Sequence, residues 1–557
     1  MKIKHSIALV VCLIFSSLAF SQKIREKEWV VHIPVPDQIV GIQGVYPEKP
    51  SGEGIIAYVN ADGMAGLKKQ QVDFYLLPHP NEQRAALTMD RSADQLKAPL
   101  TSYPTYDAYQ TMMHNYAMAF PSICRLDTFK VLPSGRQLLM MVIHNEPDSV
   151  GRNPVFLYTS SMHGDETGGF ILMMNLIDTL LNAYGQKPRI TDLVDNIKIC
   201  INPLANPDGM YAGGNQTISG ATRTNSNGVD LNRNFPDPEA GPHPDGYAWQ
   251  PETNAFMDLA DSMGFHMSSN IHSGAEVVNY PWDTWANTHA NENWWLHVGQ
   301  EYADTARKYS PANYFNDPAF PGGVTNGYDW YSISGGRQDY MNFFQGGREM
   351  TLELSYQKIT PETALKQLWN YNKRSLLNYA EQAVYGVSGR ITDSASGKPL
   401  KAKVFVDGMD ADSTHIYSRA QDGYYHRWFD AGSYTLSFSK PGYKTGKIPL
   451  TMANYQHQPL NVELVPLSSI SCSVHQQNIK VYPNPVQRNL CVQLPAEINN
   501  KNLRIRVMDM KGKVYRDKKI SAVETEYQLS VEGIASGVYV LAVSNDSYIF
   551  RKKIVVK

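Results

Sequence analysis

A histidine and a glutamate stand three residues apart in the segment His163-Gly164-Asp165-Glu166. An imidazole and a carboxylate at this spacing can share one metal ion when a turn brings them together, and a catalytic zinc ion typically takes three protein ligands and a water. His272, at the end of another strand-like segment, is the candidate third ligand. The pair alone also fits a polar turn whose carboxylate begins a helix, so a metal site needs support from other residues.

Two arginines and a second glutamate give that support. Arg233 follows Asn232 in the segment DLNRNFP, and Arg223 lies nine residues before Asn232. A planar guanidinium binds a carboxylate in a bidentate way, which suits recognition of a free chain end, although either arginine alone also fits a surface ion pair. Glu353 stands in the apolar segment TLELS. An unpaired carboxylate is costly there, so Glu353 is a functional candidate, with a core ion pair as the alternative.

These residues belong to a region, 101–385, in which strand and helix patterns alternate. Such alternation favours an α/β domain with a mixed, mostly parallel sheet flanked by helices. The ligand site of such a sheet lies beyond the carboxyl ends of its strands, where the polar clusters stand. The expected strands are 154–159, 197–202, 268–271 and 350–354, and the expected helices are 169–177 and 363–383.

The rest of the chain has a strand-rich texture. Residues 22–100 contain short alternating apolar stretches and no recognisable chemistry, so they are either a pro-segment or a simple N-terminal domain. Residues 386–467 show short β-runs with Gly and Pro turns, which predict a small β-sandwich. Residues 468–557 are expected to form a Ser-rich linker followed by a last β-rich domain.

The N-terminus and the composition limit where the protein works. Residues 1–21 combine basic residues, an apolar run and small residues at a cleavage position, which predicts a secretory signal peptide too short to span a bilayer. The formal net charge of −2 indicates neither a nucleic acid nor an anionic membrane as a partner. We expect no transmembrane anchor in the mature chain. Four cysteines remain after cleavage, without metal-binding spacing, and allow three disulfide pairings: Cys124, Cys200, Cys472 and Cys491.

Several motifs in a fixed order carry a family resemblance. Over residues 101–385 the chain shows, in order, HGDE, R-x8-NR, IHSGAEVVNYPWD, NGYDWYSISGGRQDY and TLELS. This region resembles the zinc carboxypeptidase family, especially the branch of carboxypeptidases N, E, D and M. The resemblance implies one Zn²⁺ held by His163, Glu166 and His272. It also implies Glu353 as general base and Arg223 as the group that stabilises the developing oxyanion.

The same resemblance implies how a substrate is held. Asn232 and Arg233 would bind the terminal carboxylate of a peptide or protein, and Tyr331 matches the tyrosine that caps the substrate. Asp283 and Gln338 fall on the positions that line the terminal side-chain pocket, where an acidic floor favours Lys or Arg. The branch often shows Met before that Gln, whereas this chain has Arg337. An inward-pointing Arg337 would repel basic substrates.

Two later segments extend the likeness. Residues 387–466 resemble the transthyretin-like β-sandwich that follows the catalytic domain in this branch. The segment from about residue 478 resembles the C-terminal sorting domain of the type IX secretion pathway. This likeness implies the type IX secretion machinery as a partner. It also implies a protein that is secreted or held at the outer cell surface.

Three functions fit a chain of this kind. The first is an active carboxypeptidase. The second is a related zinc hydrolase acting on a cell-wall amide or an acyl-amino acid, which predicts loss of the Asn-Arg clamp or of the substrate tyrosine. The third is a non-catalytic peptide-binding surface protein, which predicts eroded metal ligands or base. The clamp, the tyrosine, the ligands and the base are all present, and this favours the first.

Overall fold

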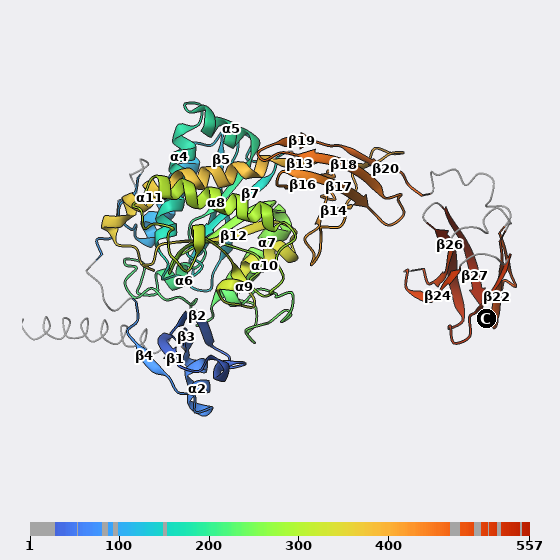
Figure 1. Ribbon diagram of the computed structural model, residues 1–557, viewed down its shortest axis with the longest axis horizontal. Helices are drawn as coiled ribbons and strands as arrows, with labels where there is room; N and C mark the ends of the chain where they lie inside the picture. Colours follow the sequence, from blue (N-terminus) through green and yellow to red (C-terminus); the bar gives the residue numbers. More distant parts are fainter. Residues whose placement is uncertain are drawn as a thin grey trace, which may run out of the picture.

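The computed structural model describes residues 28–557 apart from 53, 81–86, 93–98, 149–152, 468–478, 495–502, 511, 521–524 and 546–547. The expected signal peptide and Ser-rich linker therefore lie outside the described residues. Figure 1 shows a large central domain, an N-terminal module (residues 28–77) beside it, and two smaller β-domains that follow it in the chain. We call these last two the sandwich domain (386–464) and the tail domain (479–557).

The central domain contains one eight-stranded sheet with the order β11-β10-β12-β9-β7-β8-β6-β5. Its four middle strands run parallel, while β10 against β12, β6 against β8 and β5 against β6 are antiparallel. The sheet is therefore mixed and mostly parallel, as the sequence predicts. Its strands are β5 (Cys124–Val131), β6 (Gln137–Ile143), β7 (Val155–Ser160), β8 (Lys198–Asn202), β9 (Met267–His272), β10 (Glu276–Tyr280), β11 (Val324–Asn326) and β12 (Arg348–Leu354).

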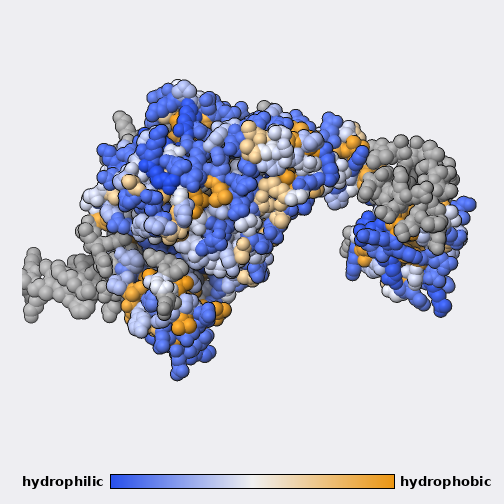
Figure 2. Space-filling view, viewed as in Figure 1, coloured by the Kyte–Doolittle hydropathy of each residue, from blue (hydrophilic) through white to orange (hydrophobic). Residues whose placement is uncertain are grey.

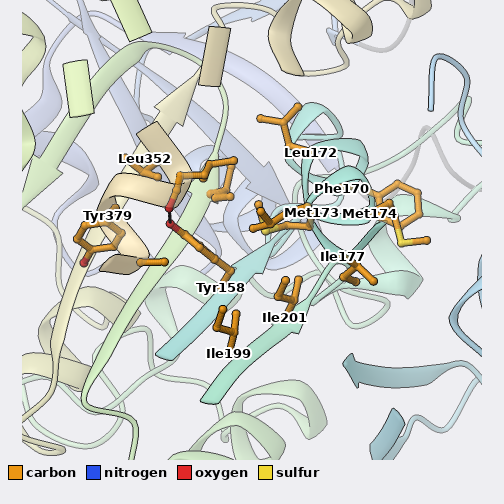
Figure 3. Packing of buried hydrophobic residues seen from close by; sticks show 14 of the residues in the cluster. Tyr158, Phe170, Leu172, Met173, Met174, Ile177, Ile199, Ile201, Leu352 and Tyr379 are labelled. Atoms are coloured by element: carbon orange, nitrogen blue, oxygen red, sulfur yellow. Dashed lines mark hydrogen bonds between the residues drawn. The ribbon is translucent and has the colours of Figure 1, made fainter. Parts of the chain in front are cut away.

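Helices cover both faces of this sheet because its strands are apolar on both sides. In β7, Phe156 and Tyr158 join one buried cluster, while Val155 and Leu157 join the other. Figure 3 shows Met173 of helix α4 pointing toward Tyr158, whose hydroxyl donates to a backbone carbonyl of α11 at 2.7 Å. The first cluster includes α3 (Tyr106–Ala119), α4 (Gly168–Ala183), α5 (Pro188–Asn196), α8 (Glu292–Lys308) and α11 (Glu362–Glu381), and the second includes α7 (Pro251–Met263) and α10 (Arg337–Phe343).

Short elements after the strands shape one edge of the sheet. The carboxyl ends of β7, β9 and β12 lie side by side there, because these strands are parallel neighbours. Two short elements, η2 (Leu231–Arg233) and α9 (Gly327–Trp330), supply residues of a cavity that opens here, and α6 (Pro207–Met210) and η3 (Pro321–Gly323) lie in other connections.

The N-terminal module is a four-stranded antiparallel sheet of order β2-β3-β1-β4 with one helix. Its core is a separate apolar cluster that includes Val31, Ile33 and Leu67. Figure 2 shows hydrophobic residues on the surface of this module. Its elements are β1 (Glu28–Ile33), η1 (Pro36–Ile39), β2 (Val45–Ser51), β3 (Gly54–Asn60), α2 (Ala61–Lys69) and β4 (Tyr75–Leu77).

The sandwich domain consists of two small sheets around one core and is joined closely to the central domain. Trp428 belongs to the core of the central domain, and its Nε1 donates to the carbonyl of Gln382 at 3.0 Å. Buried Arg348 donates in return to the carbonyl of Thr414 at 2.8 Å. The transthyretin-like identity remains a prediction. Its elements are η4 (Gln382–Val384) at the junction, β13 (Gly386–Asp393), β14 (Lys403–Val406), β15 (Ile416–Tyr417), β16 (Tyr424–Arg427), β17 (Gly432–Ser439), β18 (Gly446–Met452), β19 (His457–Pro459) and β20 (Val462–Leu464).

The tail domain has its own core between a three-stranded and a four-stranded sheet. Cys491 there, and Cys124 and Cys200 in the central domain, are buried and unpaired, whereas Cys472 lies outside the described residues. No helix in the described part of the chain is long and apolar enough to cross a membrane. The strands are β21 (Lys480–Tyr482), β22 (Asn489–Gln493), β23 (Leu503–Met508), β24 (Val514–Ile520), β25 (Glu526–Ser530), β26 (Gly537–Asn545) and β27 (Tyr548–Val556).

Candidate metal centre and substrate cleft

Three side chains from two strand ends converge at the carboxyl edge of the central sheet. His163 and Glu166 follow β7, and His272 is the last residue of β9. The Nδ1 atoms of the two histidines are 3.1 Å apart. Oε1 of Glu166 lies 3.0 Å from Nδ1 of His163, and Oε2 lies 2.9 Å from Nδ1 of His272. All three residues are buried.

This donor set fits a zinc ion. Zinc takes imidazole nitrogen and carboxylate oxygen at about 2.0–2.2 Å in a tetrahedral arrangement, which places the ligand atoms about 3.3 Å from one another. One donor atom from each of the three residues falls within 4.8 Å of the others. Two imidazole nitrogens that face each other beside a buried carboxylate are stabilised when a cation lies between them, because a buried charge must be compensated.

Asp230 orients one of these ligands. Its Oδ1 lies 3.0 Å from Nε2 of His163, the ring atom that does not face Glu166. Its Oδ2 accepts from Nε of Arg223 at 2.9 Å. Burial alone raises the pKa of Asp230, but the charges of Arg223 and His163 outweigh it and hold that pKa well below the usual value. A carboxylate that accepts from a ligand histidine fixes the ring tautomer and raises its basicity.

Glu353 faces the same centre from β12. It pairs with His272 across the parallel strands, and it lines one cavity with the three candidate ligands. Among the described residues, none gives its buried Oε2 a hydrogen bond. Burial, and then the charge of Glu166, raise the pKa of Glu353 well above its usual value. A carboxylate of raised pKa holds a proton more strongly, which suits acceptance of a proton from water.

The two guanidinium groups lie on the same cavity. Arg223 is buried, and its Nη1 lies 3.4 Å from Oε1 of Glu166. Arg233 follows Asn232 in η2, and its Nη1 donates to the carbonyl of Asn232 at 2.9 Å. Tyr331 also lines this cavity, and burial raises its pKa to about 12, so its phenol is neutral at physiological pH. The structure thus brings the predicted clamp and capping residues together.

Asp283 is a buried acid of this cavity, and Gln338 lies behind it. Nε2 of Gln338 donates to Oδ1 of Asp283 at 3.0 Å, while its Oε1 accepts from the backbone N–H of Thr351 at 2.8 Å. Asn279 also donates to Oδ1 of Asp283, at 3.1 Å. Burial raises the pKa of Asp283 to about 6. Gln338 therefore holds the carboxylate in place, and among the residues that the structure describes it is not part of the cavity wall.

Arg337 does not face this pocket. Its guanidinium is buried against Glu349, with Nε 2.9 Å from Oε1 and Nη2 3.1 Å from Oε2. It also lies over the ring of Phe256 at 5.4 Å. The positive charge is compensated by Glu349 of β12, so Arg337 does not oppose a basic side chain beside Asp283.

Three polar residues of the centre had no role assigned from the sequence. Asp230 stands two residues before Asn232 within the same motif, and this proximity was a usable signal. Lys358, five residues after Glu353, lies 2.8 Å from Oε1 of Glu166. Glu48 of the N-terminal module is 2.7 Å from Nζ of Lys358, and its sequence surroundings gave no signal because the contact depends on how the module docks.

Comparison with known proteins decides the family. The family model described as zinc carboxypeptidase matches residues 109–375. Carboxypeptidase M of Mus musculus is 34% identical over 363 residues, which are 63% of this chain and 81% of that relative. The chain belongs to the zinc carboxypeptidase family. The carboxypeptidase N catalytic chain of Homo sapiens is 30% identical over 66% of this chain and 87% of its own length.

Further comparisons add other carboxypeptidases and a match to the C-terminal segment of this zinc carboxypeptidase homologue. Carboxypeptidase SOL1 of Arabidopsis thaliana is 33% identical over 62% of this chain and 68% of its own length. The solved structure of carboxypeptidase A from Helicoverpa armigera aligns with a TM-score of 0.49 at 18% identity, over 64% of this chain and 98% of that one. A model of the secretion system C-terminal sorting domain matches residues 480–557. The resemblances to the metallocarboxypeptidases and to a sorting domain are thus confirmed.

Proposed function

We propose that this metallocarboxypeptidase releases the C-terminal residue of peptides and proteins and prefers terminal Lys or Arg. One juxtaposition carries the proposal: the metal triad, Glu353, both guanidinium groups and the buried Asp283 line a single cavity. An enzyme that cleaves internal bonds has no use for an arginine clamp beside its metal. An acid at the cavity floor gives a cationic side chain its charge partner.

The residues divide the reaction between them. His163, Glu166 and His272 hold the zinc, which when bound polarises the scissile carbonyl and acidifies water. Glu353 takes the proton from the attacking water and passes it to the leaving amine. Arg223 stabilises the negative charge that develops on the carbonyl oxygen, a contribution often worth about 3 kcal/mol per donor.

The remaining residues select the substrate. Asn232 and Arg233 hold the terminal carboxylate, which an internal peptide bond does not offer, and Tyr331 caps the bound residue. Asp283, held by Gln338, pairs with a terminal lysine or arginine side chain. The cavity wall also contains Ser273, Asn279, Thr351 and, from the N-terminal module, Glu48, which have no part in this division.

The cellular setting follows from the two ends of the chain. The sorting domain at residues 480–557 marks the chain for export to the cell surface or the medium. We propose that residues 1–21 direct the first export step and that the type IX secretion machinery performs the second. The peptidase domain at 101–385 would then act on extracellular peptides.

A matched peptide panel tests the activity. Peptides that differ only in the last residue (Arg, Lys, Leu, Glu) are incubated with the zinc-loaded protein and analysed by mass spectrometry. The controls are the same peptides with an amidated C-terminus and the same reactions with a chelator. We expect loss of one residue from the Arg and Lys peptides, slower loss from Leu, and none from amidated or chelated samples. Internal cleavage, or equal cleavage of amidated peptides, would contradict the proposal.

A further inference from the structure

Strand β2 of the N-terminal module reaches into the substrate cleft. Among the described strands it pairs with β3 alone, at the edge of its sheet, and its register shifts between Pro47 and Lys49. A bulge of this kind leaves one residue out of the pairing and redirects its side chain. The residue left out is Glu48, and its side chain lines the same cavity as Glu353.

Two neighbouring residues of this strand contact cationic side chains, one of them the proposed carboxylate clamp. The carbonyl of Pro47 accepts from Nη2 of Arg233 at 2.8 Å, on the guanidinium proposed for the terminal carboxylate. The carboxylate of Glu48 pairs with Lys358 at 2.7 Å. A main-chain carbonyl and a carboxylate here resemble the end of a bound peptide in their chemistry.

The space that remains is too small for a substrate. The cavity holds about 40 Å³, room for about three water molecules. A terminal amino-acid residue with its carboxylate needs several times this volume, since ligand pockets typically measure about 300 Å³ or more. With Pro47 and Glu48 in place, the clamp is closed to a peptide end.

Other residues of the module support the centre instead of filling it. Glu28 accepts from the backbone N–H groups of Arg223 and Thr224, each at 2.9 Å. The hydroxyl of Tyr58 donates to Oδ2 of Asp165 at 3.0 Å. These groups are buried and hold the loops that carry Arg223 and the metal ligands. Removal of the whole module would therefore disturb the centre, whereas displacement of the edge strand alone would open it.

We propose that Pro47 and Glu48 form an internal strap that competes with the substrate's terminal carboxylate while the rest of the N-terminal module stays docked. The inference rests on the proposed function, because it takes Arg233 as the carboxylate clamp. The strap is a part of the active enzyme that each substrate displaces. The apparent Kd for a substrate or product then equals the intrinsic Kd divided by the fraction of molecules in which the strap is open.

Steady-state kinetics of three full-length, zinc-loaded proteins test the strap: wild type, Glu48→Ala and Asp62→Asn. Asp62 is the control, since it accepts from Tyr247 at 2.8 Å across the same interface but does not line the cleft. For an Arg-ending peptide we expect Glu48→Ala to lower KM about fivefold with unchanged kcat, and to lower Ki for free L-arginine equally. Asp62→Asn should match wild type.

Each other kinetic outcome has a definite meaning. An unchanged KM in Glu48→Ala overturns the strap, and a raised KM overturns it by showing that Glu48 binds the substrate. A lowered KM in Asp62→Asn also overturns it, because loosening of the whole module would then suffice. A wild type that releases no terminal residue instead contradicts the proposed function.

Hydrogen exchange on the wild type gives a second measurement that needs no variant. Saturating free L-arginine should speed amide exchange in residues 45–51 and leave 28–33 and 54–60 unchanged. No change in 45–51, or equal acceleration in all three segments, would overturn the strap, the latter because it indicates release of the whole module.

Discussion

The carboxylate of Asp230 lies 3.0 Å from Nε2 of His163, on the side of the ring opposite to the atom that faces Glu166. The same carboxylate accepts from Nε of Arg223 at 2.9 Å. One buried acid therefore sets the orientation of a metal ligand and of the group proposed for the oxyanion. Metal affinity and transition-state stabilisation depend on it together.

Asp230→Asn should weaken zinc binding about 10- to 100-fold, the usual cost of losing a partner behind a ligand histidine. The amide is neutral and offers one acceptor atom where the carboxylate offers two, so it cannot serve His163 and Arg223 equally well. Zinc affinity is measured by competition with a chromogenic chelator.

Asp178→Asn is the matched control for that measurement. Asp178 is also a buried acid of the central domain, and it accepts from the hydroxyl of Tyr116 at 3.1 Å, away from the metal ligands. We expect the zinc affinity of this variant to equal that of the wild type, even where the substitution lowers the stability of the fold. Equal zinc affinity in Asp230→Asn and wild type would show that Asp230 does not support His163.

Glu353→Gln should fold and bind zinc normally but lower kcat roughly 100- to 10,000-fold, the range for loss of a general base. The amide has nearly the same shape and cannot accept the proton. Glu276→Gln on the neighbouring strand β10 serves as control and should retain wild-type kcat. A turnover near normal in Glu353→Gln would remove Glu353 as the base.

Asp283→Asn should lower kcat/KM for Arg-ending peptides by about 100-fold and change it much less for Leu-ending ones, because a buried charge partner is lost only for the cation. The substitution keeps the size of the side chain that Gln338 and Asn279 hold. The measurement is the ratio of kcat/KM for two peptides that differ in the last residue. Equal losses for both would contradict the pocket assignment.

The preference for basic residues should also fade in acid. Burial raises the pKa of Asp283 to about 6, so its carboxylate is charged above that pH and neutral below it. The Arg-to-Leu ratio of kcat/KM should be constant above pH 7 and fall by up to about tenfold per unit below pH 6. The ratio cancels pH effects on Glu353 and on the metal ligands, which both substrates share. A ratio independent of pH between 5 and 8 would contradict this reading.

The sequence predicted the four middle strands of the sheet, because each is a short apolar run that can be read locally. The run 154–159 alternates between two buried faces as β7 does, and the helix expected at 363–383 is α11 at Glu362–Glu381. The order of the eight strands could not be predicted from the sequence, since it depends on which distant segments pair. Strand β10 is an example, since it runs parallel to β11 and antiparallel to β12.

Most of the predicted site residues converge because they stand at or near strand ends or in the connections between strands, whereas Gln338 lies on helix α10. Residues that reach the site only because the N-terminal module docks on the central domain could not be predicted from the sequence. Glu48 reaches Lys358 across more than 300 positions of sequence, and nothing in the segment around it encodes that contact. The orientation of Arg337 could not be predicted either, because it is set by an ion pair with Glu349 on another element.

Glu28→Ala should destabilise the central domain by about 2–5 kcal/mol, because it leaves the buried N–H groups of Arg223 and Thr224 without an acceptor. Thr224→Val is the graded comparison. It removes only the hydroxyl bond to Glu28, at 2.6 Å, and should cost about 1 kcal/mol. Urea unfolding followed by tryptophan fluorescence measures both variants. Equal stability of Glu28→Ala and Thr224→Val would show that the N-terminal module does not hold the Arg223 loop, since the two backbone bonds would then contribute nothing beyond the hydroxyl.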